Sequence, residues 1–210
     1  MVTLYGAQGS GSAAIEVALA MAGVPHRRVE AAPWQPSAEV DELRRVNPLA
    51  QVPTLQLDDG SVLSESAAIL IHLGLEHPAS GLLPAAASQR AQALRGLVFI
   101  AANCYAAIGV IDYPERWSTD VGDAAHDAIR AAARQRLHAM WSLFADQFTG
   151  SPWLGGERIG ALDILAATVS TWSGARAHLR SARPALFALL LRIEAHPQVA
   201  PVWARHWPLS

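Results

Sequence analysis

Three polar residues in a row, Ser64-Glu65-Ser66, stand directly before the apolar segment 67–73, AAILIHL. Hydroxyl residues in front of an apolar segment of helical period predict the start of a helix. The first turn of a helix carries unpaired N–H groups and partial positive charge, which suit an anionic group, and Glu65 adds a fixed negative charge. Residues 64–66 could therefore hold a carboxylate and an ammonium together, as the end of an amino acid presents them. The alternative is an ordinary helix start with one capping serine.

The stretch before these residues predicts a hairpin. Two apolar runs, 54–57 and 61–63, are joined by Asp-Asp-Gly, which is typical of a tight turn between antiparallel strands. Pro53 opens the first run, where its missing N–H is tolerated. If the Val52–Pro53 bond is cis, the backbone of Val52 is turned outward and is free to pair with a bound peptide.

Ser10 and Ser12 lie in a loop of small residues, 6–12, which precedes a predicted helix over 13–22. The field at that helix N-terminus would favour a nearby thiolate, so either hydroxyl is a candidate for thiol activation. A role as helix caps is the alternative for both. The loop lacks the Gly-x-Gly-x-x-Gly and Walker A spacings, so it is a weak candidate for nucleotide binding.

The elements that must position these residues form a small α/β unit. A strand at 2–5 and the helix at 13–22 are followed by a strand at 26–30 and a helix at 39–46, before the hairpin. The order β-α-β-α-β-β-α predicts a mixed sheet whose first two strands are parallel, through a right-handed crossover.

Beyond residue 77 the sequence becomes rich in Ala, Leu and Arg with helical periodicity, and we expect an all-helical domain. The predicted organisation is a first domain over 1–77, a linker over 78–85 and a helical domain over 86–210. Within the last of these, Pro and Gly breaks separate helices predicted at 86–113, 122–148, 161–178, 184–196 and 198–204.

Composition limits the classes of function. The net charge is −2 and all 16 basic residues are Arg, without a basic cluster that could follow a nucleic acid backbone. We expect no signal peptide, no apolar run long enough to cross a bilayer, and no metal site, since the histidines lack ligand spacing. The single Cys104 excludes an internal disulfide. These features predict a cytoplasmic protein without nucleic acid or membrane partners.

The motifs taken in order resemble the cytosolic glutathione S-transferases, most of all the bacterial beta class. The pattern Asn-Pro-x-x-Gln-Val-Pro-x-Leu-x-Leu-Asp-Asp-Gly-x-x-Leu-x-Glu is matched from Asn47 to Glu65. Residues 97–101 resemble the start of the fourth helix of that class, and residues 153–172 resemble the segment leading into its buried sixth helix. The resemblance covers nearly the whole chain. It implies a thioredoxin-like N-terminal domain followed by an all-α domain.

The resemblance also implies how glutathione is held. Pro53 would be cis, and the backbone of Val52 would pair with the cysteinyl part of glutathione. Glu65 and Ser66 would hold the γ-glutamyl end, with Gln51 alongside. Relatives meet the glycine carboxylate from the loop near residue 35, some with a lysine, where this chain has Trp34 and Gln35.

An apolar, electrophilic second substrate is expected between the domains. By resemblance it would lie against Tyr105, Trp172 and Tyr113, and Tyr105 stands where many beta-class relatives have a histidine. The family also implies a homodimer, glutathione as co-substrate and no metal.

The residue that activates the thiol departs from the family pattern. The beta-class cysteine falls on Gly11, and the serine of the theta- and zeta-like classes falls on Gly9. A shift of one residue in the loop would make Ser10 the group that hydrogen-bonds the sulfur, with Ser12 second. A backbone N–H of residues 10–12 could supply the donor instead. Tyr5 is a poor match to the catalytic tyrosine of other classes.

The expected function is glutathione transfer to apolar electrophiles, a detoxification reaction. One alternative is a glutathione-dependent isomerase or dehalogenase, and another is a non-catalytic, regulatory glutathione-binding protein.

Overall fold

A computed structural model describes residues 1–119, 122–150 and 152–208. The N-terminal part is the expected α/β unit. Its elements are β1 (Val2–Gly6), α1 (Ser12–Ala22), β2 (His26–Glu30), α2 (Ala38–Val46), β3 (Thr54–Gln56), β4 (Val62–Leu63) and α3 (Ser66–Glu76).

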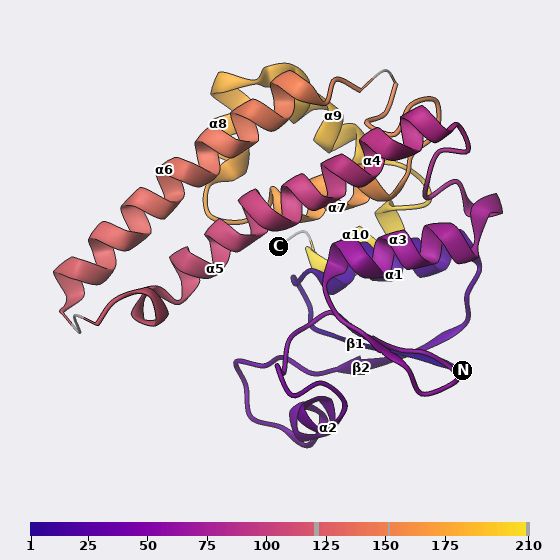
Figure 1. The fold of residues 1–210 in the computed structure, drawn as a ribbon, viewed down its shortest axis with the longest axis horizontal. Coiled ribbons are helices and arrows are strands. Elements are labelled where there is room, and N and C mark those ends of the chain that lie inside the picture. The colour runs from indigo at the N-terminus through magenta and orange to yellow at the C-terminus, as the bar shows by residue number, and fades with distance from the viewer. Residues whose placement is uncertain (120–121, 151, 209–210) are drawn as a thin grey trace.

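The strands form one sheet in the order β2-β1-β3-β4. β1 and β2 are parallel, while β3 is antiparallel to both β1 and β4, so the predicted mixed sheet is confirmed. Helices α1 and α3 cover one face and α2 covers the other (Figure 1). A small core on the α2 side contains Tyr5, Val29, Val40 and Leu43.

Beyond α3 the described residues form helices and the turns between them. After a 3₁₀ turn, Pro78–Ser80, the elements are α4 (Ala87–Phe99), a π-helical segment (Ile100–Tyr105), α5 (Ala106–Asp112), a 3₁₀ turn (Pro114–Trp117), α6 (Asp123–Gln147), α7 (Ala161–Val169), α8 (Ala175–Ala182), α9 (Pro184–Glu194) and α10 (Ala200–His206). The α4–α5 run and α6 extend together as a long arm (Figure 1). The borders predicted at residues 77 and 86 stay a prediction.

Helix α7 joins the two parts of the molecule. All of its residues are buried, and it packs against α1, α3, α4 and α9. The main apolar core is consequently continuous from α1 and α3 into the helical part. The loop ends of the sheet and the helices beside them are thus fixed relative to each other.

The single helix predicted over 161–178 is wrong. The chain leaves the helix after Val169 and starts α8 at Ala175, because Ser173 (φ +55°) and Gly174 (φ +80°) adopt the left-handed region. The interruption places Trp172 in a turn rather than on a helix face.

The expectation about apolar length also needs correction. The helical run Ala87–Asp112 has a mean hydropathy of 1.8 and is long and apolar enough, by length and composition alone, to cross a membrane. In the structure its Leu97, Ile100 and Cys104 are fully buried, and the run packs against α6 and α7. Core packing accounts for part of its composition, since 39% of its most apolar window is buried.

The start of α7 is held from two sides. Both Asp163 carboxylate oxygens are used: Oδ1 accepts from Leu154 N (2.8 Å), and Oδ2 accepts from Gly160 N (3.0 Å) and Gly155 N (3.3 Å). Burial raises the Asp163 pKa to about 6 although these bonds oppose the shift. A Cβ built on Gly160 would lie 2.8 Å from the Leu82 carbonyl oxygen, which explains the absence of a capping hydroxyl there.

Candidate functional site

The loop before β3 is held by two buried polar side chains. Asn47 donates to the Thr54 hydroxyl (2.8 Å), which in turn donates to the carbonyl of Gln51 (2.7 Å). The Val52–Pro53 bond is cis, as the resemblance implied. Within the described residues neither the N–H nor the C=O of Val52 has a hydrogen-bond partner, so this backbone is available to an extended peptide.

The start of α3 presents unpaired polar groups. Glu65 has φ +66°, an uncommon conformation for a residue with a side chain, and such strain often marks a functional site. Its carboxylate is exposed and makes no ion pair with the described part of the chain. Ser66 is buried as a residue, and its hydroxyl, which keeps some contact with solvent, makes no hydrogen bond with the described residues. The helix start predicted at residues 64–66 is therefore in place, and no described residue pairs with the N–H groups of its first turn.

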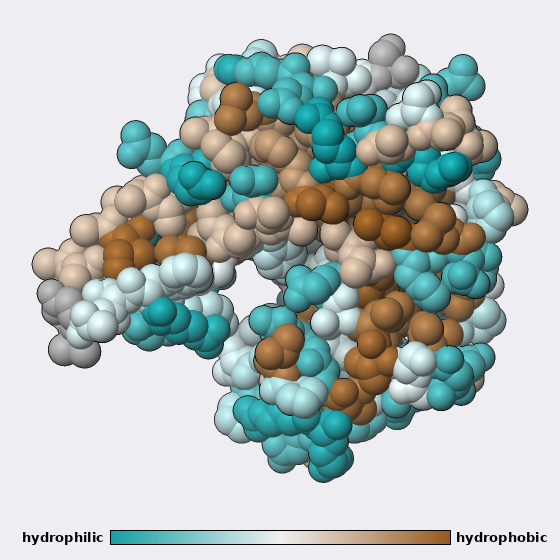
Figure 2. Space-filling view, viewed as in Figure 1, coloured by the Kyte–Doolittle hydropathy of each residue, from teal (hydrophilic) through white to brown (hydrophobic). Residues whose placement is uncertain are grey.

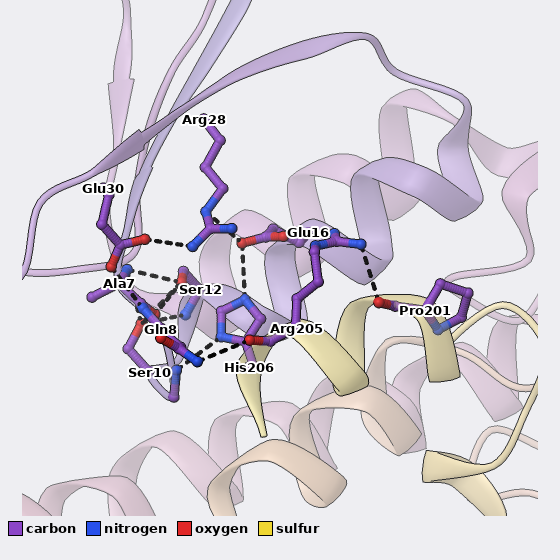
Figure 3. A network of polar contacts seen from close by, with 11 residues as sticks. Ala7, Gln8, Ser10, Ser12, Glu16, Arg28, Glu30, Pro201, Arg205 and His206 are labelled. Atoms are coloured by element: carbon purple, nitrogen blue, oxygen red, sulfur yellow. Dashed lines mark hydrogen bonds and ion pairs between the residues drawn. The ribbon is translucent and has the colours of Figure 1, made fainter. Parts of the chain in front are cut away.

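The hydroxyls of Ser10 and Ser12 face the loop's own backbone (Figure 3). Ser10 Oγ donates to the Ala7 carbonyl (2.7 Å) and lies 2.9 Å from Ser12 Oγ. The N–H of Ser12 donates to Ser10 Oγ (3.2 Å), and the Ala7 N–H lies 3.3 and 3.2 Å from the two hydroxyl oxygens. Both serines are buried. Their hydroxyls thus fold the loop at the start of α1.

Gly9, which precedes Ser10, is hydrogen-bonded to two side chains of the helical part. Its N–H donates to His206 Nδ1 (3.1 Å), and its carbonyl accepts from Trp172 Nε1 (3.3 Å). Because Nδ1 accepts, the His206 hydrogen sits on Nε2 and faces Glu16 Oε1 at 2.9 Å.

Glu16 is the buried centre of a charge cluster around that histidine (Figure 3). Its carboxylate also meets Arg205 Nη2 (3.0 Å) and Arg28 Nε (3.2 Å). Burial by itself would raise the Glu16 pKa, but the hydrogen bonds from His206 and Arg205 and the nearby positive charges lower it. The cluster ties α1, β2 and α10 together behind the loop.

Gly11 lies where the two halves of the site meet. A Cβ built on Gly11 would lie 2.6 Å from Tyr105 Oη and 3.3 Å from both Pro53 Cδ and Ser66 Oγ. The Tyr105 ring packs against Trp172 with centroids 5.5 Å apart. Tyr105 ends the π-helical segment, and a hollow between the α5–α6 arm and the α/β unit is visible in Figure 2.

The structure thus brings together most of the predicted site residues, but Gln35 and Tyr113 lie apart from Gly11, as does Tyr5, which the sequence had not favoured. Gln35 is exposed in the loop after β2. Tyr113 is 39% exposed beneath the Arg116 guanidinium. Tyr5 donates to Glu42 on α2 (2.7 Å), on the other face of the sheet.

The positioning roles of four residues were missed from the sequence. They are Asn47, Thr54, Glu16 and His206. The first two flank the Gln-Val-Pro turn and could have been suspected, since short polar side chains commonly fold such turns. The pair Glu16–His206 carries no signal in the sequence because the partners are far apart along the chain.

A mixed α/β sheet with a cis-proline loop, followed by helices packed on α1 and α3, defines the fold class of glutathione transferases. The family model for the glutathione S-transferase N-terminal domain matches residues 12–75. The uncharacterized GST-like protein YncG of Escherichia coli K12 is 30% identical over 173 residues, 82% of each chain. The chain belongs to the glutathione S-transferase family.

Solved structures agree with this assignment. The glutathione transferase homologue from Sulfitobacter, solved with bound glutathione, has a TM-score of 0.84 at 23% identity over 96% of each chain. The sphingomonad glutathione S-transferase complexed with glutathione has a TM-score of 0.78 at 26% identity, over 97% of this chain and 98% of that one.

Proposed function

We propose that this protein binds glutathione at the junction of β3, α3 and the α1 loop, and activates its thiol for attack on apolar electrophiles. The observation that carries the proposal is the set of unpaired groups around Gly11. Within the part of the chain that the structure describes, no partner is found for the backbone of Val52, the hydroxyl of Ser66 or the carboxylate of Glu65. Relatives of the same fold have been solved with glutathione.

We propose a partner for each part of glutathione. The α-carboxylate of the γ-glutamyl end would accept from Ser66 and the first N–H groups of α3, while Glu65 would pair with its ammonium. The cysteinyl backbone would bond to the N–H and C=O of Val52, and Gln51 lies beside it. For the glycine carboxylate we propose the loop containing Gln35.

Ser10 and Ser12 stay the proposed thiol-activating serines of the loop. Their hydroxyls are already bonded to Ala7, so either would have to rotate to reach the sulfur. The N–H of Gly11 makes no hydrogen bond with the described residues and offers a backbone donor. The Ser10→Ala variant distinguishes these routes. If it keeps full activity, Ser10 is not the hydrogen-bond donor to the sulfur, and Ser12 or a backbone N–H remains as the donor.

The electrophile would occupy the hollow beside Tyr105 and Trp172, with Tyr113 farther out. A detoxification role in the cytoplasm, where reduced glutathione is maintained, follows from this proposal.

Calorimetry with reduced glutathione, followed by conjugation to a chloronitrobenzene, tests the proposal. Binding should be saturable, and Ser66→Ala should weaken it about fivefold to fiftyfold, the loss of one charge-assisted hydrogen bond. Ser61→Ala, in the exposed hairpin turn, is the matched control. Absence of binding to the wild type would refute the proposal.

Binding without turnover of any electrophile would favour a non-catalytic glutathione-binding protein. The commitment of both serine hydroxyls to Ala7 is the observation that favours this second candidate.

We also propose a twofold dimer. Apolar surface gathers over α3 and α4 in Figure 2, and Leu75 (58%) and Val98 (55%) on these helices are exposed. Sedimentation velocity should show a dimer that Val98→Asp weakens, whereas Leu191→Asp on α9 should not. A wild-type monomer at micromolar concentration would contradict the dimer.

A further inference from the structure

The hydroxyl of Tyr105 is a polar group at the centre of the site. No hydrogen bond of this hydroxyl is found among the described residues, although its ring is packed against Trp172 and its oxygen lies over Gly11. Tyr105 is partly buried, and a tyrosine hydroxyl in a packed setting commonly has a hydrogen-bond partner. The arrangement therefore suits a ligand atom that accepts a hydrogen bond beside Gly11.

The position of that ligand atom follows from the two anchors. Gly11 is adjacent to both Pro53, which follows the free backbone of Val52, and Ser66. A peptide paired with Val52 and held at Ser66 by its amino-acid end must direct the side chain between these anchors toward Gly11. In glutathione that side chain is the thiol.

We propose that the Tyr105 hydroxyl is a further catalytic hydrogen-bond donor to the sulfur of glutathione, in addition to the donors proposed in the loop of residues 10–12. This inference rests on the proposed function. The unpaired N–H of Gly11 would act as a second donor on the same sulfur.

Tyr105 is suited to donate a hydrogen bond and not to remove a proton. Burial raises its pKa to about 12, and the negative charges of Glu65 and Asp112 contribute. The hydroxyl therefore keeps its proton at neutral pH and stabilises the thiolate, which lowers the thiol pKa.

The chemical step balances without another reactant. The thiol loses its proton to solvent, the thiolate forms a C–S bond with the electrophilic carbon, and the C–Cl bond of a chloronitrobenzene breaks to release chloride. Tyr105 stays protonated throughout.

Replacing Tyr105 by Phe removes the hydroxyl and keeps the ring that packs on Trp172. The pKa of bound glutathione, titrated by thiolate ultraviolet absorbance, should rise by about one to two units. At neutral pH, kcat/KM should fall about ten- to a hundredfold, with its pH profile shifted upward by the same amount. Glutathione affinity should stay within about threefold, because the peptide anchors are untouched.

Tyr5→Phe is the matched control, since it removes a phenol hydroxyl that is bonded to Glu42 away from the site. Its bound-thiol pKa should equal that of the wild type. An unchanged thiol pKa in Tyr105→Phe, with glutathione still bound, would overturn the role of Tyr105 and leave the proposed function standing. Failure of the wild type to bind glutathione would overturn both, and the titration decides the matter even for a protein without turnover.

Discussion

At the scale of single residues, Gly11 is important because it has no side chain. Where the resemblance to the beta class predicts a cysteine, the absence of a side chain at Gly11 leaves room for the hydroxyl of Tyr105. Any side chain at Gly11 would compete with that hydroxyl for one position, and the competition can be measured.

Gly11→Ala should lower kcat/KM about tenfold or more, because the new methyl would lie 2.6 Å from Tyr105 Oη. The ring cannot simply swing aside, since it packs on Trp172. In a Tyr105→Phe background the same change should cost much less, with a coupling free energy of about 1 kcal/mol. Steady-state kinetics of the four proteins give the coupling.

Gly109→Ala is the control for this cycle, because a Cβ on Gly109 meets nothing within 4 Å. It should be neutral or slightly stabilising in helix α5. Strictly additive effects of Gly11→Ala and Tyr105→Phe would contradict direct competition between the methyl and the hydroxyl.

At the scale of elements, the start of α7 shows how packing overrides helix preference. Serine is a better N-cap than glycine by a few tenths of a kcal/mol. At Gly160, however, a Cβ would press on the Leu82 carbonyl, a backbone atom that also accepts from Ala161 N. Crowding of this kind costs about 1–3 kcal/mol and should outweigh the cap.

Gly160→Ser should therefore lower the free energy of unfolding by about 1–2 kcal/mol in urea titration. Gly160→Ala, which adds the Cβ without a capping hydroxyl, should lose slightly more. If Gly160→Ser is more stable than the wild type, the backbone around Leu82 must shift to accommodate the new side chain, and the expected crowding is contradicted.

The order of elements could be predicted from the sequence because the spacing of apolar residues indicates each helix or strand, and the turn residues indicate where it ends. The hairpin, α1 and α2 all lie within a residue or two of their predicted bounds. The turn at 170–174 was missed because the apolar period continues across it, although Gly174 marked the place.

The site was only partly predictable for a different reason. Residues 51–66 are contiguous, so a motif can describe them, whereas Gly9 is held by His206, which lies 197 residues away. The orientations of the Ser10 and Tyr105 hydroxyls depend on packing between elements, which local sequence does not encode.

At the scale of the whole molecule, the Glu16 cluster links stability to pH. Glu16 is buried, and its folded-state pKa is lowered, so its ionised form stabilises the folded state above its unfolded pKa, near 4.5. That contribution is lost as the pH falls through the lower folded-state pKa.

Glu16→Gln should reduce the free energy of unfolding at pH 7 by about 3 kcal/mol, because Arg28 and Arg205 lose their buried counter-charge. The difference from wild type should shrink as the pH falls below about 4.5. Urea titrations at several pH values measure it, with the exposed Glu39→Gln as control. A difference that stays constant with pH would mean that the carboxylate charge is not what stabilises the fold.

The grip of α10 on Gly9 also sets an order of events during synthesis. A growing chain emerges from its N-terminus, so residues 1–76 leave the ribosome well before His206, which bonds Gly9. The strands of the α/β unit can pair early. The hydrogen bond from Gly9 to His206, which holds the loop beside Gly11, forms only after α10 has been synthesised. The part of the protein that begins the chain is thus completed by the part that comes near its end.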